Sequence, residues 1–244
     1  MNALAPILEP AAYTHVFARW RGARVREFWG PGNVGDLLIR RGAEQLYAAY
    51  GITVCDEHTR PDVVFYGGGG NMGPLYPGTR TVRHTARTFA SEHGVPLIVL
   101  PQSWTGHEEI LADQFFAREN RSLEFCPSAI LAPDLALAYS PQIEAIEPQH
   151  DCGWFFRGDV ECAQPKLSAN CGDPTLMATT GDDYLRLASL YRVIHTDRLH
   201  FAIAGMICQR EVHLYGNSYF KNEAIYHLWL RGRGCHWASS VAEN

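Results

Sequence analysis

The chain alternates short runs of apolar residues with longer amphipathic segments. Apolar runs of roughly four to eight residues predict buried strands, and amphipathic segments predict helices. In the first part of the chain, the predicted strands cover 25–29, 62–66, 96–100 and 129–131, and the predicted helices cover 37–50, 81–93, 108–116 and 121–125. In the second part, the predicted strands cover 152–156, 191–194 and 211–215, and the predicted helices cover 182–191, 201–207 and 222–230. Strands that alternate with helices predict parallel sheets joined by crossover helices, which is an α/β fold.

A break in this pattern divides the chain in two. Residues 141–149 contain two prolines and show little periodicity, so we interpret them as a linker. The sequence therefore predicts two Rossmann-like domains that face a cleft. The N-terminal domain covers residues 1–140, and the C-terminal domain covers residues 150–244 and is reduced in size for such a fold.

Composition excludes several classes of protein. The hydrophobic fraction of 46% and the charged fraction of 19% are typical of a soluble globular protein. The net charge of −5, without a run of basic residues, argues against nucleic-acid binding. The first ten residues lack the basic region of a secretion signal, and no apolar run approaches the roughly 20 residues of a membrane span. We therefore expect a cytoplasmic protein without a membrane span.

The seven cysteines are scattered and contain no C-x-x-C pair. This spacing favours reduced thiols over a disulfide framework or a zinc site. The chain also lacks the H-E-x-x-H and G-x-S-x-G patterns, which argues against a metalloprotease and an α/β-hydrolase.

The segment 195–200 (His-Thr-Asp-Arg-Leu-His) is the most informative candidate site. Arg198 and His200 lie where the predicted strand 191–194 leads into the apolar helix 201–207. In alternating α/β sheets ligands bind at this edge, and the N–H groups of a helix N-terminus favour an anion. The segment therefore predicts a site for a phosphate or a carboxylate. The alternative is that His200 is a structural histidine.

Glycine-rich segments follow two of the predicted strands. Gly30–Asp36 either brings the backbone close to a ligand or forms a tight turn in which Asp36 caps the next helix. Gly67–Gly70 favours a loop that closely contacts a ligand over a plain turn, because four consecutive glycines are entropically costly. Neither segment matches G-x-G-x-x-G or a Walker pattern, so nucleotide binding has little support. After the next strand, Gln102 and Ser103 either project into the same cleft and bind sugar hydroxyls or form a simple turn.

Arginines stand beside carboxylates in two further segments, Arg118–Ser122 and Phe156–Glu161. Such an arginine either binds phosphate or carboxylate through its fork of donors, or forms a solvated surface pair that contributes little. Asp134 follows the strand at 129–131 among apolar neighbours, where a cap or turn role is the simplest interpretation.

In this order along the chain, the motifs resemble the polysaccharide pyruvyl transferase family. The matching stretches are Asn33–Asp36, Gly67–Gly69, Leu100–Ser103, Arg118–Ser122, Ala132–Ala136, Phe156–Glu161 and Thr196–His200, with a weaker match at Asn217–Lys221. They extend over residues 28 to 230, approximately. The family has a two-domain fold like that of GT-B glycosyltransferases. It uses phosphoenolpyruvate to place a pyruvate ketal across two hydroxyls of a sugar, with release of phosphate.

The resemblance implies a set of site residues. Arg118, Arg198 and His200 would be catalytic, and Leu199 would bind the donor through its backbone. The other implied substrate-binding residues are Asn33, Asp36, Gly68, Gly69, Gln102, Ser103, Asp134, Arg157 and Lys221. No cofactor and no metal are expected, because phosphoenolpyruvate is itself the donor substrate. The implied acceptor is an exopolysaccharide or glycoconjugate precursor; whether it is lipid-linked, with peripheral contact to a membrane, stays open.

The chemistry expected from the resemblance begins with protonation of the donor at C3. A sugar hydroxyl then attacks C2, phosphate leaves, and a second hydroxyl closes the ketal. His200 would act as general acid or balance phosphate charge, and the two catalytic arginines would stabilise the leaving phosphate. Either Asp36 or Asp134 would accept a hydroxyl proton.

Two other functions stay open at this point. One is a GT-B-like glycosyltransferase that uses a nucleotide sugar, and the other is a non-catalytic, sugar-binding relative. The presence of Arg118, Arg198 and His200 together argues against the second, because a purely structural descendant does not need all three.

Overall fold

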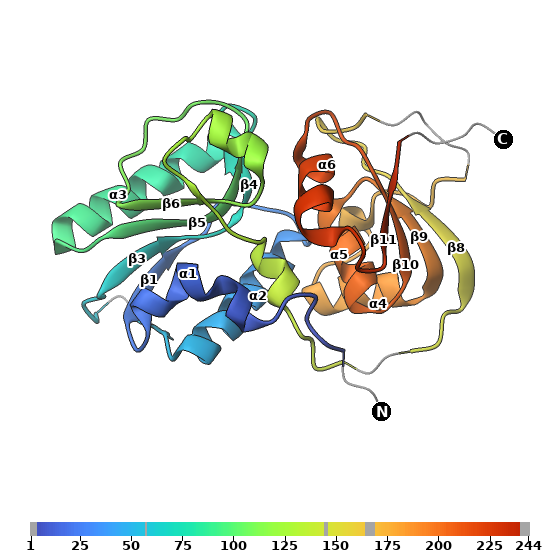
Figure 1. Ribbon diagram of the computed structural model, residues 1–244, viewed down its shortest axis with the longest axis horizontal. Helices are drawn as coiled ribbons and strands as arrows, with labels where there is room; N and C mark the ends of the chain where they lie inside the picture. Colours follow the sequence, from blue (N-terminus) through green and yellow to red (C-terminus); the bar gives the residue numbers. More distant parts are fainter. Residues whose placement is uncertain (1–3, 57, 144–145, 164–168, 240–244) are drawn as a thin grey trace. The chain divides into compact units, whose positions relative to one another are not determined.

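The computed structural model describes residues 4–56, 58–143, 146–163 and 169–239 (Figure 1). It divides into two compact units. We call Leu8–Gly32 with Ile39–Ala138 the N-terminal unit, and the described parts of Met1–Ile7, Asn33–Leu38 and Tyr139–Asn244 the C-terminal unit. The short segment Asn33–Leu38 thus groups with residues far from it in the sequence. The predicted arrangement of two domains around a cleft stays a prediction.

The N-terminal unit is built on a parallel sheet. Its strand order is β2–β1–β3–β5–β6–β7, and β4 pairs with β5. The strands are β1 (Arg24–Phe28), β2 (Thr53–Val54), β3 (Val63–Tyr66), β4 (Gly69–Met72), β5 (Leu97–Trp104), β6 (Gln114–Ala117) and β7 (Ile130–Leu131). Each pairing between them is parallel, which confirms the predicted α/β class.

Helices cover both faces of this sheet (Figure 1). They are α1 (Thr14–Phe17), α2 (Asp36–Tyr50) and α3 (Arg80–His93). Because successive strand residues point to opposite faces, Phe65 packs on Phe17 of α1 and Tyr47 of α2, whereas its neighbours share a core with α3. Gly94 ends α3 in the left-handed conformation, at φ 61°, as the sequence predicts.

Three local predictions in this unit are wrong. Gln102 and Ser103 do not follow the strand in a turn, because they lie within β5, which extends to Trp104. The segment 108–116 is not a helix: an irregular stretch leads into β6. Tertiary contacts override its helical pattern, because Glu108 forms a buried ion pair with Arg83 and Asp113 accepts a hydrogen bond from the Leu97 N–H at 2.8 Å. The expected loop at Gly67–Gly70 is also shorter than predicted, since β4 begins at Gly69.

The C-terminal unit contains a second, smaller parallel sheet in the order β11–β10–β9–β8. Its strands are β8 (His150–Phe155), β9 (Tyr191–Thr196), β10 (Glu211–Tyr215) and β11 (Cys235–Ala238). Its helices are α4 (Gly181–Ser189), α5 (Leu199–Ile207) and α6 (Lys221–Ile225), which continues as a π-helical turn over Tyr226–Leu230. Strand β11 was not predicted, and the helix predicted to reach Tyr191 stops at Ser189 because Tyr191 starts β9. Residues 144–145 of the predicted linker lie outside the described residues.

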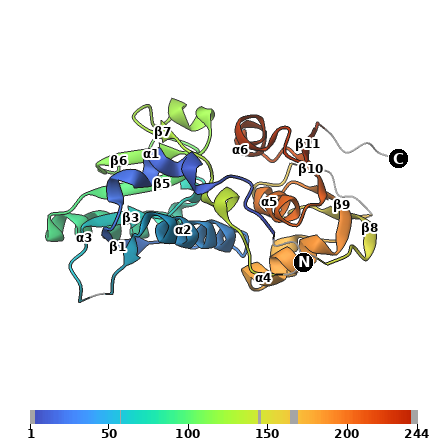
Figure 2. The ribbon, with the colours of Figure 1, turned by 60° about the horizontal axis from the view of Figure 1, so that its bottom comes forward.

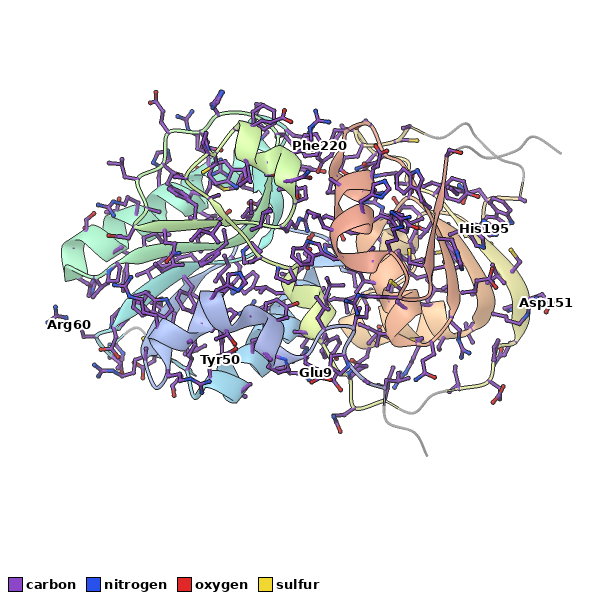
Figure 3. The ribbon with its side chains drawn as sticks, viewed as in Figure 1. Glu9, Tyr50, Arg60, Asp151, His195 and Phe220 are labelled. Carbon is purple, nitrogen blue, oxygen red and sulfur yellow. The ribbon has the colours of Figure 1, made fainter. Side chains whose placement is uncertain are left out.

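Helices α4 and α5 lie on the same face of the second sheet, as Figures 1 and 2 both show. Phe201 of α5 contacts the rings of Phe155 on β8 and Tyr184 on α4, with centroids 4.7 and 5.1 Å away. In-register rings form a row across all four strands: Trp154, His195, His213 and His236. His195, in the middle of this row, is labelled in Figure 3.

Short 3-10 helices connect the longer elements. They are Pro10–Tyr13, Ala18–Trp20, Pro77–Thr79, Asn120–Glu124, Leu135–Ala138 and Pro174–Leu176. In the part of the chain that the structure describes, no helix has both the length and the apolar character to cross a membrane.

Candidate functional site

The junction between β9 and α5 has the geometry that the sequence predicts. Strand β9 ends at Thr196, Arg198 is the N-cap of α5, and His200 is in the first helical turn. The Arg198 N–H donates to Thr196 Oγ1 at 3.0 Å, and this bond fixes the turn between strand and helix. Apart from His200, every residue of α5 is buried, so the helix N-terminus is held firmly against the sheet.

The Arg198 side chain is bound by two carboxylates. Its Nε donates to Asp173 Oδ1 at 3.0 Å, and its Nη2 contacts Asp173 Oδ2 and lies 2.9 Å from Asp159 Oδ2. Burial lowers the pKa of Arg198, but the hydrogen bond and charge of Asp173, with the charge of Asp159, raise it beyond its ordinary value. The guanidinium therefore stays charged although its side chain is only 8% exposed.

Arg157, in the loop after β8, joins the same group. Its Nε and Nη2 bind the two oxygens of Asp159 at 2.6 and 2.9 Å, and its Nη1 contacts Glu161. Glu161 also accepts from Lys221 Nζ at 2.6 Å and from Asn217 Nδ2 at 2.8 Å. The surface-pair alternative is wrong for Arg157, since its side chain is only 3% exposed.

These residues come from the loops after β8, β9 and β10, which are neighbouring parallel strands. The carboxyl ends of parallel strands meet at one edge of a sheet, where α/β proteins bind ligands. The C-terminal unit therefore gathers three basic side chains and three carboxylates at that edge: Arg157, Arg198, Lys221, Asp159, Glu161 and Asp173.

A fourth carboxyl group lies directly before Arg198. Asp197 is fully buried, and its Oδ1 accepts a hydrogen bond from the Arg157 N–H at 2.9 Å. Its Oδ2 has no hydrogen-bond partner among the described residues. Burial raises the pKa of Asp197 to about 6, although the hydrogen bond from Arg157 and the charges of Arg157 and Arg198 oppose the rise.

The turn before α2 lies beside His200. Asn33 Oδ1 accepts from the Gly35 N–H and Asp36 Oδ2 accepts from the Asn33 N–H, both at 2.8 Å. The Asp36 carboxylate lies 3.8 Å from His200 Nδ1. A Cβ on Gly35 would lie 2.9 Å from the Cβ of His200, so this close approach requires glycine. The structure thus brings together the predicted residues Asn33, Asp36 and His200.

The remaining predicted residues belong to the N-terminal unit. Arg118 donates to Asp134 Oδ2 at 2.5 Å and to Ser103 Oγ at 2.7 Å, and the side chains of both ionic partners are only 1% exposed. Ser103 in turn donates to Glu119 at 2.8 Å. Asp134 Oδ1 accepts from the Ala136 N–H at 2.9 Å, which confirms its predicted turn role. The surface-pair alternative is therefore wrong for Arg118 as well.

Gln102 binds the glycine-rich segment of the same unit. Its Nε2 donates to Gly67 O at 2.5 Å, and its Oε1 accepts from the Asn71 N–H at 3.2 Å. A Cβ on Gly67 would lie 2.1 Å from the Trp29 ring, and a Cβ on Gly68 would lie 3.0 Å from Pro101 O. Gly67 is therefore required by the packing of the protein itself, and Gly68 packs tightly against the backbone of β5. Roles of Gly68, Gly69, Gln102 and Ser103 toward a substrate stay predictions.

Sequence reasoning missed the carboxylates that hold Arg157 and Arg198. Asp159 and Glu161 stand inside a motif that it singled out, but Asp173 is remote from Arg198 in the sequence and nothing in the pattern marked it. None of the seven cysteines, all of which the structure describes, takes part in a disulfide. No group of three or more His, Cys, Asp or Glu residues within the described ranges could hold a metal ion.

Comparisons with known proteins agree with the motif order. A family model described as polysaccharide pyruvyl transferase matches residues 33–173. A protein of Bacillus subtilis (strain 168), provisionally named pyruvyl transferase EpsO, is 25% identical, and the alignment covers 82% of this chain and 83% of that protein. The crystal structure of an uncharacterized protein from Klebsiella pneumoniae superposes with a TM-score of 0.74 at 21% identity, covering 94% of this chain and 98% of that one. This last likeness is one of fold alone.

Proposed function

Because the chain belongs to the polysaccharide pyruvyl transferase family and is therefore a transferase, we propose that its donor is phosphoenolpyruvate. The pyruvate unit is moved onto two hydroxyls of a sugar as a ketal, and phosphate is released. The acceptor is a precursor of an exopolysaccharide or another glycoconjugate.

The observation that carries this proposal is the group of basic side chains at the carboxyl edge of the second sheet. Phosphoenolpyruvate carries a phosphate and a carboxylate close together, and arginine forks match both groups. Arg198 binds its own carboxylates through Nε and Nη2, and a guanidinium has further N–H donors on Nη1 for a ligand. Arg157 and Lys221 are two further cations at the same edge, held in place by Asp159 and Glu161, and the N-terminus of α5 at Leu199 adds backbone N–H groups.

The proposed reaction needs one acid and one base near the donor. A proton is added to C3 of the enol, one sugar hydroxyl bonds to C2, and the bond from C2 to the phosphate oxygen breaks. The second hydroxyl then bonds to C2, and the two hydroxyl protons are released. His200 supplies the proton or balances the charge of the phosphate, while Arg198 stabilises the charge that develops on the leaving group.

We assign the base to Asp36 rather than to Asp134. Asp36 is partly exposed and lies 3.8 Å from His200 Nδ1. Asp134 is buried and is engaged by Arg118 and the Ala136 N–H, so a hydroxyl of the acceptor has no access to it. Arg118, by the same argument, stabilises the N-terminal unit, and a direct role of Arg118 toward the donor stays a prediction.

Calorimetric titration separates the proposed function from its two rivals. The protein is titrated with phosphoenolpyruvate and with a panel of nucleotide sugars. We expect binding of phosphoenolpyruvate, which the Arg198→Lys substitution weakens at least roughly tenfold, because lysine lacks the guanidinium fork. Arg192→Lys is the matched control, since Arg192 is on β9, the strand that leads to Arg198, and its side chain is 60% exposed and pairs with the exposed Asp151.

Each contrary result identifies a rival. Binding of a nucleotide sugar without binding of phosphoenolpyruvate would establish a glycosyltransferase. Binding of neither would favour a non-catalytic relative. For the chemical step, His200→Ala should abolish phosphate release in the presence of acceptor, whereas His227→Ala, at an exposed position, should not.

A further inference from the structure

Asp197 is a buried acid that the proposed chemistry does not use. It is fully buried at the carboxyl end of β9, directly before Arg198. Its Oδ1 accepts from the Arg157 N–H at 2.9 Å, and its backbone carbonyl accepts from Asn222 Nδ2 at 2.7 Å. It therefore joins the loop after β8 to the loop after β9 and to α6.

The second oxygen of this carboxyl group, Oδ2, is buried and has no hydrogen-bond partner among the described residues. A carboxylate oxygen in that position is costly, because a buried charge needs hydrogen bonds or paired charges to be stable. The charged and titratable groups around this edge are Arg157, Asp159 and Glu161 after β8, Arg198 and His200 after β9, Lys221 of α6, Asp173, Tyr184 of α4 and Asp36. The charges of Arg157 and Arg198 stabilise the carboxylate, and burial opposes them.

We propose that Asp197 is a positioning residue of the donor site, which holds the Arg157 backbone through Oδ1 and takes up one proton at Oδ2 when the anionic donor binds. The inference rests on the proposed function. A donor with several negative charges, bound beside Arg157 and Arg198, repels the Asp197 carboxylate. It also interacts with the two arginines that stabilise this carboxylate, so donor binding favours the protonated form of Asp197. The proton comes from solvent, and the donor itself is unchanged by this step.

The pKa of Asp197, already raised to about 6 by burial, makes such uptake accessible near neutral pH. At pH 7 the group is mostly ionised in the free protein, and a further rise in the complex protonates it. The expected uptake at Asp197 is therefore roughly one proton per donor bound.

The test compares proton uptake by the wild type and by Asp197→Asn. Calorimetric titration with phosphoenolpyruvate at pH 7, in buffers of different ionisation enthalpy, measures the number of protons bound with the donor. The asparagine keeps the oxygen that accepts from Arg157 but cannot titrate, so we expect the wild type to take up roughly one proton more than this variant. Asp151→Asn, at a side chain that is 92% exposed, should leave the uptake unchanged.

The outcomes separate this inference from the proposed function. Equal uptake by the wild type and Asp197→Asn, with both binding the donor, would overturn the role of Asp197 and leave the proposed function standing. No binding of phosphoenolpyruvate by the wild type would overturn both. Asp197→Ala should weaken donor binding at least roughly tenfold where Asp197→Asn does not, because only alanine removes the acceptor of the Arg157 N–H.

The ligand-free protein gives an independent measurement. The folded-state pKa of Asp197 lies above its ordinary value of 3.8, so the folded state binds the proton more tightly than the unfolded state. The resulting stability is present below about pH 4 and is lost as the pH rises through about 6. The Tm of the wild type should therefore fall relative to that of Asp197→Asn between these pH values. A constant difference in Tm would contradict a titrating Asp197.

Discussion

Removing the Arg118 side chain should destabilise the N-terminal unit strongly. In Arg118→Met, Asp134 loses its ionic partner at 2.5 Å and Ser103 loses the donor at 2.7 Å, while both ionic side chains of the wild type are only 1% exposed. Asp134 Oδ1 still accepts from the Ala136 N–H in this variant. Breaking a buried ion pair costs about 3–5 kcal/mol, because it leaves an uncompensated buried charge. With a denaturant slope of about 2 kcal/mol/M, the midpoint of urea unfolding should fall by roughly 2 M.

Arg121→Met is the matched control for this prediction. Arg121 stands in the same motif and pairs with Glu124 at 2.6 Å, but both side chains are more than half exposed. Such a surface pair contributes at most about 1 kcal/mol, so the control should unfold close to the wild type. Urea unfolding is followed by circular dichroism for the wild type and both variants. Equal midpoints for the two variants would refute a structural role of Arg118. A stable Arg118→Met protein that no longer binds phosphoenolpyruvate would show that Arg118 binds the donor directly.

Two other substitutions test the surroundings of the site. Gly35→Ala should lower the rate of pyruvyl transfer roughly tenfold, because the new Cβ would lie 2.9 Å from the Cβ of His200. The control in the kinetic assay is Gly78→Ala, whose new Cβ meets no atom within 4 Å. Equal rates for the two variants would contradict the importance of the contact with His200. Burial and the charge of its neighbour His213 lower the pKa of His195 to about 4, so the unfolded state binds the proton more tightly than the folded state. The free energy of unfolding should therefore fall as the pH falls from about 6.5 to about 4. His195→Phe should remove about 2 kcal/mol of this loss, a value reduced because solvent screens the half-buried ring. If the substitution leaves the dependence of Tm on pH unchanged over this range, the role of His195 is contradicted.

The sequence was informative wherever local pattern decides structure. A continuous apolar run correctly predicted β3. The transition from a predicted strand to a predicted helix correctly placed Arg198 and His200 at the N-terminus of α5. The periodicity of the segment 37–50 matched α2 to within one residue. In each case the burial of a whole run fixes the element, so neighbouring residues carry enough signal.

Prediction failed where distant residues decide. The segment 108–116 has a helical pattern, but Arg83 holds Glu108 in an irregular stretch. The ion pairs of Arg198 with Asp173 and of Arg118 with Asp134 could not be predicted either. The two residues of each pair are distant in the sequence and meet only in the folded chain. Such ion pairs depend on which loops meet at a sheet edge, and this is a property of the folded chain.

Strand β11 shows a different limit. It covers Cys235–Ala238, a segment of only four residues in which two adjacent rings stand between Cys235 and Ala238. Two nearby glycines, Gly232 and Gly234, have positive φ. Its pairing with β10, rather than its own hydrophobicity, makes it a strand.

The most direct test of the central claim is to detect the ketal itself. The protein is incubated with ¹³C-labelled phosphoenolpyruvate and hexosides that carry free hydroxyl pairs, and mass spectrometry and phosphate release are measured together. We predict an acceptor that gains the mass of labelled pyruvic acid less one water, with one phosphate released per ketal, and no product from His200→Ala. Phosphate release without a modified acceptor, or full product from His200→Ala, would contradict the account.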